Sequence, residues 1–405
     1  MDDRKKHIEN LQKLDFQIEN QDGSSIYFVD KQGEYIAKNE SPYIIIALDK
    51  AKEFDVDAVY FRRFDDGRPP LAQIYIYDNI TQQKSNDYYA QKHKEIWSSC
   101  EVAIFFIIDK ETIRIYDCRK PVKICKNSLR SIPIDTIDLL AEVDDAISKY
   151  KSQNFENGSF WENENTKQHF SNYKIASERL IKGLREIRKK LRKNKSLTPE
   201  LIDKLLIICI LIKYLEETGG GKNKNYAHVF FEKATGFQDL ESIIRNNKLC
   251  CLLSALSNHF NGGIFSVDED FKQELAKTDI RILADFFEAN YRNNLFGWKE
   301  YSFEHIPVEL ISNFYEEFIP KDTTQPNEKS KENTGAVYTP SFLVKLLVDE
   351  CLPLNDVNEN VKLIDPACGS GIFLVTAYKR LVQRWRVKCK KENKLANTNP
   401  KILKK

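Results

Sequence analysis

The strongest constraint on the fold of this chain lies near its C-terminus, where an apolar run, a glycine turn and a helical pattern follow one another directly. The apolar run Val361 to Ile364 predicts a strand. The string that follows is Asp365-Pro366-Ala367-Cys368-Gly369-Ser370-Gly371-Ile372-Phe373-Leu374. The pattern then predicts a helix that ends near Lys391. A strand, a glycine turn and a helix in this order form the first unit of a Rossmann-like sheet.

The chemistry of this turn suits a small ligand that carries an ammonium group. Gly369 and Gly371 let the backbone pass close to a ligand, because no Cβ stands in the way. The N-terminus of the following helix offers unpaired N–H groups, and Asp365 can pair with an ammonium. S-adenosylmethionine has an ammonium, a carboxylate and an apolar thioether arm but no phosphate. Because the turn has neither a GxGxxG nor a Gly-Lys-Ser/Thr pattern, it favours this ligand over a dinucleotide or a nucleoside triphosphate.

The ten-residue string resembles motif I of the adenine-N6 DNA methyltransferases, whose pattern is Asp-Pro-Ala-Cys/Ser-Gly-Ser-Gly-x-Phe. A second string upstream, Gly335-Ala336-Val337-Tyr338-Thr339-Pro340, resembles motif X of the same enzymes, although Tyr-Thr-Pro alone is also typical of an ordinary helix start. The resemblance implies that Thr339 meets the cofactor carboxylate and that Pro340 starts the next helix. The cofactor-binding residues that it implies are Tyr338, Thr339, Pro340, Asp365, Pro366, Ala367, Cys368, Gly369, Gly371 and Phe373.

A softer resemblance extends toward the N-terminus. The segments Phe303 to Phe318 and Ser257 to Phe265, and the helix from Pro199, are similar to parts of the type IIG, or Eco57I-like, restriction–modification methylases. The resemblance implies transfer of a methyl group from S-adenosylmethionine to adenine N6 in double-stranded DNA. It places this activity in a restriction–modification or phage-defence system.

One element that this family needs is absent from the sequence. In motif IV, Asn/Asp/Ser-Pro-Pro-Tyr/Phe, the Asn side chain and a Pro carbonyl accept hydrogen bonds from the adenine amine, and the aromatic ring stacks on the flipped base. The only Pro-Pro pair here is Pro69-Pro70, and Asn399-Pro400 is followed by Lys-Ile. We therefore expect a methyltransferase domain that is truncated after motif I and inactive alone. It is a fragment, a truncated gene product or one half of a split enzyme, whose second polypeptide carries the rest of the domain and the target recognition.

The periodicity predicts four parts. Residues 1–150 are α/β, residues 151–320 form an all-α connector, residues 321–334 form a linker without apolar side chains, and residues 335–405 start the Rossmann-like methyltransferase domain. In the first part we expect a hairpin of Ser25–Val29 with Tyr35–Ala37 and a helix at Ser41–Phe54. The strands that we expect there are Val56–Phe61, Ala72–Tyr77, Val102–Ile108 and Ile113–Tyr116. In the connector, Thr198 is expected to cap a helix that ends at Gly219.

The N-terminal part invites a comparison with PD-(D/E)xK nucleases, which often precede the methylase in type IIG enzymes. Such a site needs an Asp on one strand and an acid-x-Lys on the next to hold Mg²⁺ and a water. Here Asp57 lies at the first strand, but Gln73-Ile74-Tyr75 stands where acid-x-Lys is expected. Tyr cannot replace the ammonium, so the sequence favours a degenerate nuclease-like or unrelated fold, and Mg²⁺ is expected only if the domain is a nuclease. His93 is predicted to be a surface helix residue rather than a catalyst.

Charge and composition restrict the other possibilities. The chain has 62 basic and 60 acidic residues, so any DNA footprint must be local. The run from Lys182 to Lys195 holds eight Lys or Arg in fourteen residues. It is either a solvated helix face or a phosphate-binding surface. The DNA-binding candidates in this run are Arg185, Arg188, Lys189 and Arg192. Two other functions stay open, namely a non-catalytic DNA-binding or assembly subunit and an endonuclease that uses Asp57.

The sequence also predicts a cytoplasmic protein without a membrane partner. Its apolar runs are far shorter than the roughly 20 residues that a membrane span needs, and MDDRKKHIEN at the N-terminus has no apolar signal core. The nine cysteines include no CxxC pair, which argues against a zinc site.

Overall fold

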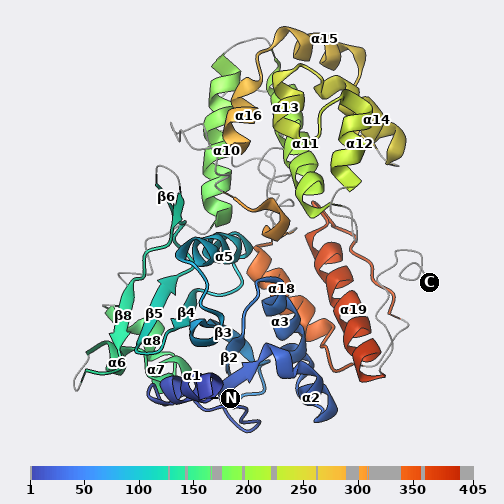
Figure 1. Cartoon of the computed structure of the whole chain (residues 1–405). Coiled ribbons are helices and arrows are strands. Elements are labelled where there is room, and N and C mark those ends of the chain that lie inside the picture. The colour runs from blue at the N-terminus through green and yellow to red at the C-terminus, as the bar shows by residue number, and fades with distance from the viewer. Residues whose placement is uncertain are drawn as a thin grey trace.

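The computed structural model describes residues 2–125, 128–141, 145–164, 166, 176–193, 197–219, 226–260, 263–288, 301–307, 309, 339–356 and 361–392. Figure 1 shows three parts, namely an N-terminal sheet with flanking helices in blue to green, a group of helices in green to yellow above it, and two C-terminal helices in orange to red beside the N-terminal part.

The N-terminal part is built on a six-stranded sheet. Its strand order is β1 (Ser25–Phe28), β2 (Ala58–Arg62), β3 (Leu71–Asp78), β4 (Ile104–Ile108), β5 (Thr112–Asp117) and β8 (Asp135–Asp138). Only the β3–β4 pair is parallel; every other neighbouring pair is antiparallel. A parallel pair needs a crossover, and α4 (Asn79–Gln82) and α5 (Asn86–Ser99) supply it. Strands β6 (Lys123–Cys125) and β7 (Ser128–Arg130) form a separate ribbon.

Both faces of this sheet are buried, which explains why β2, β3 and β4 are nearly continuous apolar runs rather than alternating ones. Successive side chains point to opposite faces. On one face Tyr60, Ile76 and Phe106 pack against α1 (Asp2–Gln12), α7 (Ser152–Glu156) and α8 (Ser159–Glu162), with α6 (Asp145–Lys149) at the β8 edge. On the other face Tyr75 and Phe105 pack against α3 (Pro42–Glu53) and α5.

The predicted strands and the helix at 41–54 are confirmed to within about two residues at each end. The predicted hairpin is wrong: Ser25–Phe28 is a strand, but it pairs with β2, and Tyr35–Ala37 belongs to helix α2 (Gln32–Ala37), which follows the short helix η1 (Val29–Lys31). The reason is tertiary. The Tyr35 hydroxyl is buried, accepts a hydrogen bond from the backbone N–H of Phe28 at 3.0 Å and donates to the Glu19 carboxylate at 3.0 Å.

The second part is helical. Its elements are α10 (Ala176–Lys193), α11 (Pro199–Thr218), α12 (Tyr226–Thr235), α13 (Leu240–Arg245), α14 (Leu249–His259), η2 (Gly263–Phe265), α15 (Glu269–Lys277) and α16 (Arg281–Phe287). Helix α11 starts and stops as predicted: the Thr198 hydroxyl accepts from the N–H of Leu201 at 3.4 Å, and Gly219 ends the helix with φ of 64°. The apolar stripe of α10 is buried in the shared core.

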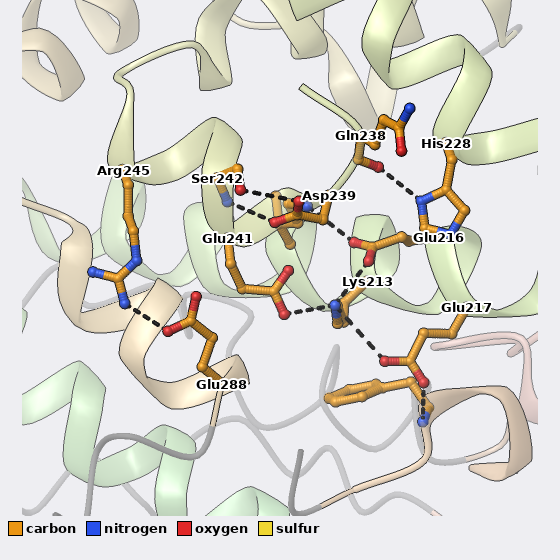
Figure 2. A network of polar contacts seen from close by, with 12 residues as sticks. Lys213, Glu216, Glu217, His228, Gln238, Asp239, Glu241, Ser242, Arg245 and Glu288 are labelled. Atoms are coloured by element: carbon orange, nitrogen blue, oxygen red, sulfur yellow. Dashed lines mark hydrogen bonds and ion pairs between the residues drawn. The ribbon is translucent and has the colours of Figure 1, made fainter. Parts of the chain in front are cut away.

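A buried charge network lies at the centre of the helical part (Figure 2). The Lys213 side chain on α11 is fully buried, and its Nζ lies 2.9 Å from Glu216 Oε1, 2.6 Å from Glu241 Oε1 and 3.7 Å from Glu217 Oε1. Burial alone would lower the pKa of Lys213, but the carboxylates of Glu216 and Glu241 raise it above its ordinary value. The ammonium is therefore charged and paired inside the core, and it joins α11 to α13.

The same network holds the short segment 301–307, which contains η4 (Phe303–His305). The Glu217 carboxylate accepts a hydrogen bond from the N–H of Phe303 at 2.8 Å. On its other side the segment contacts the N-terminal part: the Tyr301 ring stacks on Trp97 of α5, with ring centroids 5.3 Å apart, and the N–H of Ser302 donates to Ser98 Oγ at 3.0 Å. Segment 301–307 thus links the helical part to the sheet.

The third part consists of α18 (Ser341–Cys351) and α19 (Ile372–Lys391), which lie side by side (Figure 1). They share a small core of Val344, Val348, Leu352, Ile372 and Ala377.

The Lys213 network generates a prediction about stability. We expect Lys213→Met to lower the free energy of unfolding of the helical part by about 3–5 kcal/mol, because Glu216 and Glu241 would stay buried without a partner cation. Chemical denaturation followed by circular dichroism measures this change. The matched control is Lys272→Met, which removes an ammonium that pairs with exposed Glu269 and should leave the midpoint unchanged. A Lys213→Met protein as stable as the wild type would contradict the importance of the network.

Candidate functional site

The segment 361–371 is an extended stretch followed by two turns, and the strand predicted at Val361–Ile364 is not formed. No described residue pairs with the backbone of this stretch in a sheet. The side chain of Ile364 is 89% exposed and that of Leu363 is 45% exposed. A strand needs a neighbour to satisfy its N–H and C=O groups, so an apolar run with the right composition stays irregular when no partner strand is present.

The glycine turn has the geometry that its sequence predicts. Gly369 has φ of 51° and Gly371 has φ of 78°, both in the left-handed region that other residues avoid. A Cβ on Gly371 would meet no atom within 4 Å, so the backbone angle rather than crowding requires glycine there. The N–H of Gly371 donates to the carbonyl of Cys368 at 2.6 Å, which closes the turn just before α19.

Asp365 has one carboxylate oxygen engaged and one available. Its Oδ1 accepts a hydrogen bond from the N–H of Ala367 at 3.1 Å. Its Oδ2 is buried and has no hydrogen-bond partner among the described residues. A buried carboxylate oxygen without a donor is costly unless a ligand supplies one. Asp365 Oδ2 is therefore suited to accept a hydrogen bond from an ammonium group held in the turn.

Helices α18 and α19 run in the same direction. Arg380 of α19 pairs with Asp349 of α18, and Arg384 Nε donates to the carbonyl of Pro353 at 3.0 Å. In both contacts the partners lie 31 residues apart in the sequence. The same offset places Ser341, where α18 begins, beside Ile372, where α19 begins. Parallel packing therefore brings the N-termini of two helices to one end.

Two adjacent helix N-termini favour an anion. Pro340 precedes α18, and its carbonyl accepts from the N–H of Leu343 and Val344 at 2.9 and 3.1 Å. Gly371 caps α19, where no side chain accepts the first N–H groups. Thr339 is half-buried, whereas Tyr338 lies outside the described residues. Together with Asp365, this end of the helix pair can receive a ligand with both a carboxylate and an ammonium.

The other residues of the string lie around this turn. Pro366, Ala367 and Cys368 are exposed, and the half-buried Phe373 packs against the small core of α18 and α19. The structure thus gathers the described part of the predicted cofactor set at one place.

The structure separates the two residues considered for a nuclease site. Asp57 precedes β2, and its N–H donates to the carbonyl of Ile76 near the end of β3. Gln73 lies near the start of β3, beside the irregularity at Tyr60 and Phe61. From Gln73 to the strand position beside Asp57 is four residues, or about 13 Å along the strand. Asp57 and Gln73 therefore do not share a site, and Tyr75 is fully buried between them.

Asp57 belongs instead to a polar group that the sequence did not indicate, formed with His7 and Asp78. Asp57 Oδ2 accepts from the N–H of Asp78 at 2.7 Å, and its Oδ1 accepts from Gln82 Nε2 at 2.6 Å. Burial raises the pKa of Asp57 to about 6. The buried His7 ring lies 3.6 Å from Asp78, which caps α4. Within the described residues, no group of three or more His, Cys, Asp or Glu side chains is placed to hold a metal ion.

His93 is buried, so the predicted surface position is wrong. Its Nε2 lies 2.9 Å from the carbonyl of Asp117, and its Nδ1 contacts Ser131 Oγ. Burial lowers the pKa of His93 to about 4. The flanking lysines misled the sequence prediction, because Lys92 is itself largely buried and pairs with Asp55 and Glu95. His93 is a neutral, structural histidine between α5 and β5.

The structure divides the four basic candidates of α10. Arg188 forms a two-point ion pair with Asp203 of α11, and Arg192 lies 3.5 Å from the same carboxylate. Asp203 is almost fully buried; burial raises its pKa, and the Arg188 contact opposes that rise. Arg185 and Lys189 lie on the exposed side of the helix. Arg188 therefore fastens α10 to α11, while Arg185 and Lys189 face solvent.

The burial of His93 generates a prediction about pH. Its pKa of about 4 lies below the ordinary value of 6.5, so between these values the unfolded chain binds a proton that the folded chain does not. The stability that neutral His93 contributes is present above pH 6.5 and is lost as the pH falls toward 4. We expect His93→Gln to flatten the slope of unfolding free energy against pH in this range.

Denaturation midpoints at a series of pH values measure the slope. Asp57, whose raised pKa acts with opposite sign in part of this range, is common to both proteins and cancels in the comparison. The control is His259→Gln, which removes an exposed imidazole instead. An unchanged slope in the His93→Gln protein would contradict the prediction.

Comparison with known proteins adds the family. Residues 308–397 match the family model described as N-6 DNA Methylase. The MjaIX methylase subunit of a type I restriction enzyme from Methanocaldococcus jannaschii is 35% identical over 97 residues, which are 24% of this chain and 16% of that protein. The type I MjaVII methylase subunit of the same organism is 34% identical over 82 residues, which are 20% of this chain and 13% of that protein.

A longer match extends further along the chain. The type II restriction enzyme and methyltransferase RM.Eco57I of Escherichia coli is 26% identical over 157 residues, which are 35% of this chain and 14% of that protein. The chain thus spans about one sixth or less of the length of these relatives. No solved structure matches the chain significantly. No helix in the described part of the chain is long and apolar enough to cross a bilayer.

Proposed function

From the N-6 DNA methylase sequence that residues 308–397 carry, we propose that this chain forms the cofactor-binding start of a DNA adenine-N6 methyltransferase of a restriction–modification system. The observation that carries the proposal is the glycine turn, with its unpartnered Asp365 Oδ2, at the shared end of two parallel helices. The substrate is double-stranded DNA, and the cofactor is S-adenosylmethionine.

The residues at this end would hold the methionine part of the cofactor. Asp365 Oδ2 would accept a hydrogen bond from the ammonium. The N-termini of α18 and α19 would face the carboxylate, with Thr339 beside it. The left-handed turn at Gly369 and Gly371 would let the backbone lie against the ligand. When bound, the cofactor supplies an electrophilic methyl group on its sulfonium; the chain supplies position and charge.

We further propose that a second polypeptide completes the domain. The sequence contains no Asn-Pro-Pro-Tyr string to receive the adenine amine. The helix pair also leaves large apolar side chains exposed. These are Phe342 at 74%, Leu346 at 54%, Leu347 at 42%, Ile364 at 89%, Leu374 at 41% and Tyr378 at 56% exposure. Apolar exposure on this scale marks a surface that another structure covers. The remaining strands of a Rossmann-like sheet would pair with 361–364 and cover both helices.

The cofactor role is tested by methyl transfer and binding together. We expect the chain alone to transfer no labelled methyl group to mixed-sequence DNA, because it lacks the amine-binding motif. With a polypeptide that carries the remaining strands and Asn-Pro-Pro-Tyr, transfer should appear. In that complex Asp365→Asn should weaken S-adenosylmethionine binding about tenfold or more, because the contact to the ammonium loses its charge.

The matched control is Asp279→Asn, which changes an exposed acid on the helical part. Methyl transfer by the chain alone would overturn the need for a second polypeptide. Equal cofactor affinity in the Asp365→Asn and wild-type complexes would overturn the assignment of the site.

We propose that α10 contributes to DNA binding through its exposed side. Arg185 and Lys189 face solvent on this side, away from the Arg188–Asp203 ion pair. Contacts of lysine and arginine with phosphates release counterions, so binding weakens with salt. We expect the double variant Arg185→Gln/Lys189→Gln to reduce the slope of log affinity against log salt by about 2. Fluorescence anisotropy over a salt series measures it.

The control for this experiment removes the same charge elsewhere. Lys248→Gln/Lys277→Gln changes two exposed lysines on other helices and should leave the slope as it is. If both double variants flatten the slope equally, the basic side of α10 is only a solvated helix face.

A further inference from the structure

We infer that the N-terminal α/β part is a mount for the cofactor helices, and that Tyr43 and Asp49 of α3 are positioning residues for the turn at 365–371. The contact that does this joins Tyr43 and Asp49 to Arg380 and Lys390 of α19; we call it the α3–α19 contact. The inference rests on the proposed function, since it concerns the same cofactor turn. It assigns a role to a domain whose sheet shows no metal cluster among its described residues.

Tyr43 links both cofactor helices to the N-terminal part. Its hydroxyl accepts hydrogen bonds from the N–H of Leu354, just beyond α18, at 3.3 Å, and from Arg380 on α19 at 3.4 Å. The Arg380 guanidinium also lies over the Tyr43 ring, 5.5 Å from its centroid. Arg380 is almost fully buried and pairs with Asp349 of α18. One side chain of α3 thus meets the residue that sets the register of the two helices.

A second group of contacts holds the far end of α19. Lys390 pairs with Asp49, and its Nζ lies 3.2 Å from Gln32 Oε1 on α2. Gln32 in turn donates to Asp49 at 2.9 Å and to the carbonyl of Ile45 at 2.7 Å, so the carboxylate is held in place before the lysine meets it. Lys391 Nζ donates to Asn39 Oδ1 at 2.8 Å.

The two groups of contacts fix the direction of α19 as well as its position. Arg380 and Lys390 are ten residues apart on one helix, which corresponds to about 15 Å along its axis. A helix held at two points this far apart cannot pivot without breaking one of them. Its N-terminus, and therefore the turn at Gly369 and Gly371, keeps a fixed place relative to α18.

The apolar packing of the helix pair is too small to do this by itself. Its core consists of five buried side chains, and no strand neighbour holds 361–364 among the described residues. The charged partners are well shielded, with Arg380 and Lys390 side chains 8% and 25% exposed and Asp349 and Asp49 22% and 30% exposed. Shielded pairs depend strongly on geometry, so polar contacts with α3 orient the cofactor turn.

Charge reversal tests this in the full-length protein combined with the polypeptide that completes the domain. Asp49→Lys and Lys390→Asp, each alone, should weaken S-adenosylmethionine binding at least fivefold and speed backbone hydrogen exchange across 372–391. The double variant Asp49→Lys/Lys390→Asp restores an opposite-charge pair and should return both quantities to within about twofold of the wild type. Rescue by the swapped pair separates positioning from a general loss of fold.

Tyr43→Phe gives an independent measure, because it removes the hydroxyl and keeps the ring under Arg380. We expect a higher KM for the cofactor with an unchanged kcat, since the ring still holds α19 loosely. The control is the swap Asp66→Arg/Arg68→Asp, an exposed pair in the β2–β3 turn, which should change neither quantity.

The outcomes distinguish the two proposals. Wild-type affinity and exchange in both single variants would overturn the mount, and so would a double variant as weak as the singles. If the wild-type complex binds no S-adenosylmethionine at all, the proposed function fails. The exchange data on 372–391 then still show whether the α3–α19 contact holds the helix.

Discussion

The buried ammonium of Lys213 is the point on which the arrangement of the molecule depends. A charge without solvent must be paired, and the three carboxylates around it come from α11 and α13. One of them, Glu217, also accepts the N–H of Phe303 and so fixes segment 301–307. That segment packs on Trp97 of α5, which lies in the core of the helical part although it belongs to the sheet domain. Its His305 ring lies 5.0 Å from that of Phe54, just past the end of α3.

From α3 the same line of contacts reaches the cofactor turn. Tyr43 and Asp49 project from α3 to α19, and α19 begins at Gly371. The sheet domain therefore connects the helical part, where Arg185 and Lys189 face solvent, with the turn at Asp365. If DNA lies on α10, as we propose, this path joins the DNA surface to the cofactor site through packed side chains and shielded ion pairs.

The two kinds of core in this protein differ in completeness. The N-terminal sheet is covered on both faces and its large aromatic side chains are buried. The pair α18 and α19 buries five side chains and exposes Phe342 and Ile364 almost fully. Apolar burial drives the folding of the first part, whereas the second depends on polar contacts with its neighbours. A surface with this much exposed apolar area agrees with a helix pair that forms one side of a larger sheet structure.

The sequence by itself determined features that depend on neighbours along the chain. The caps of α11 at Thr198 and Gly219, the apolar strands β2 to β5 and the left-handed turn at Gly369 and Gly371 all follow from local steric and hydrogen-bonding rules. The residues of the glycine turn were identified for the same reason, since their spacing alone states the need for a close backbone approach.

Only the tertiary structure decided what depends on distant partners. Tyr35 lies in a helix because its hydroxyl meets Phe28 and Glu19, and His93 is buried because α5 lies against β5. Val361–Ile364 has the composition of a strand, but hydrogen bonds to a neighbouring strand make a strand, and no described residue supplies them. Arg188 looked like a DNA contact until Asp203 was placed beside it. Sequence records which groups a residue offers, and the fold alone decides which partners they meet.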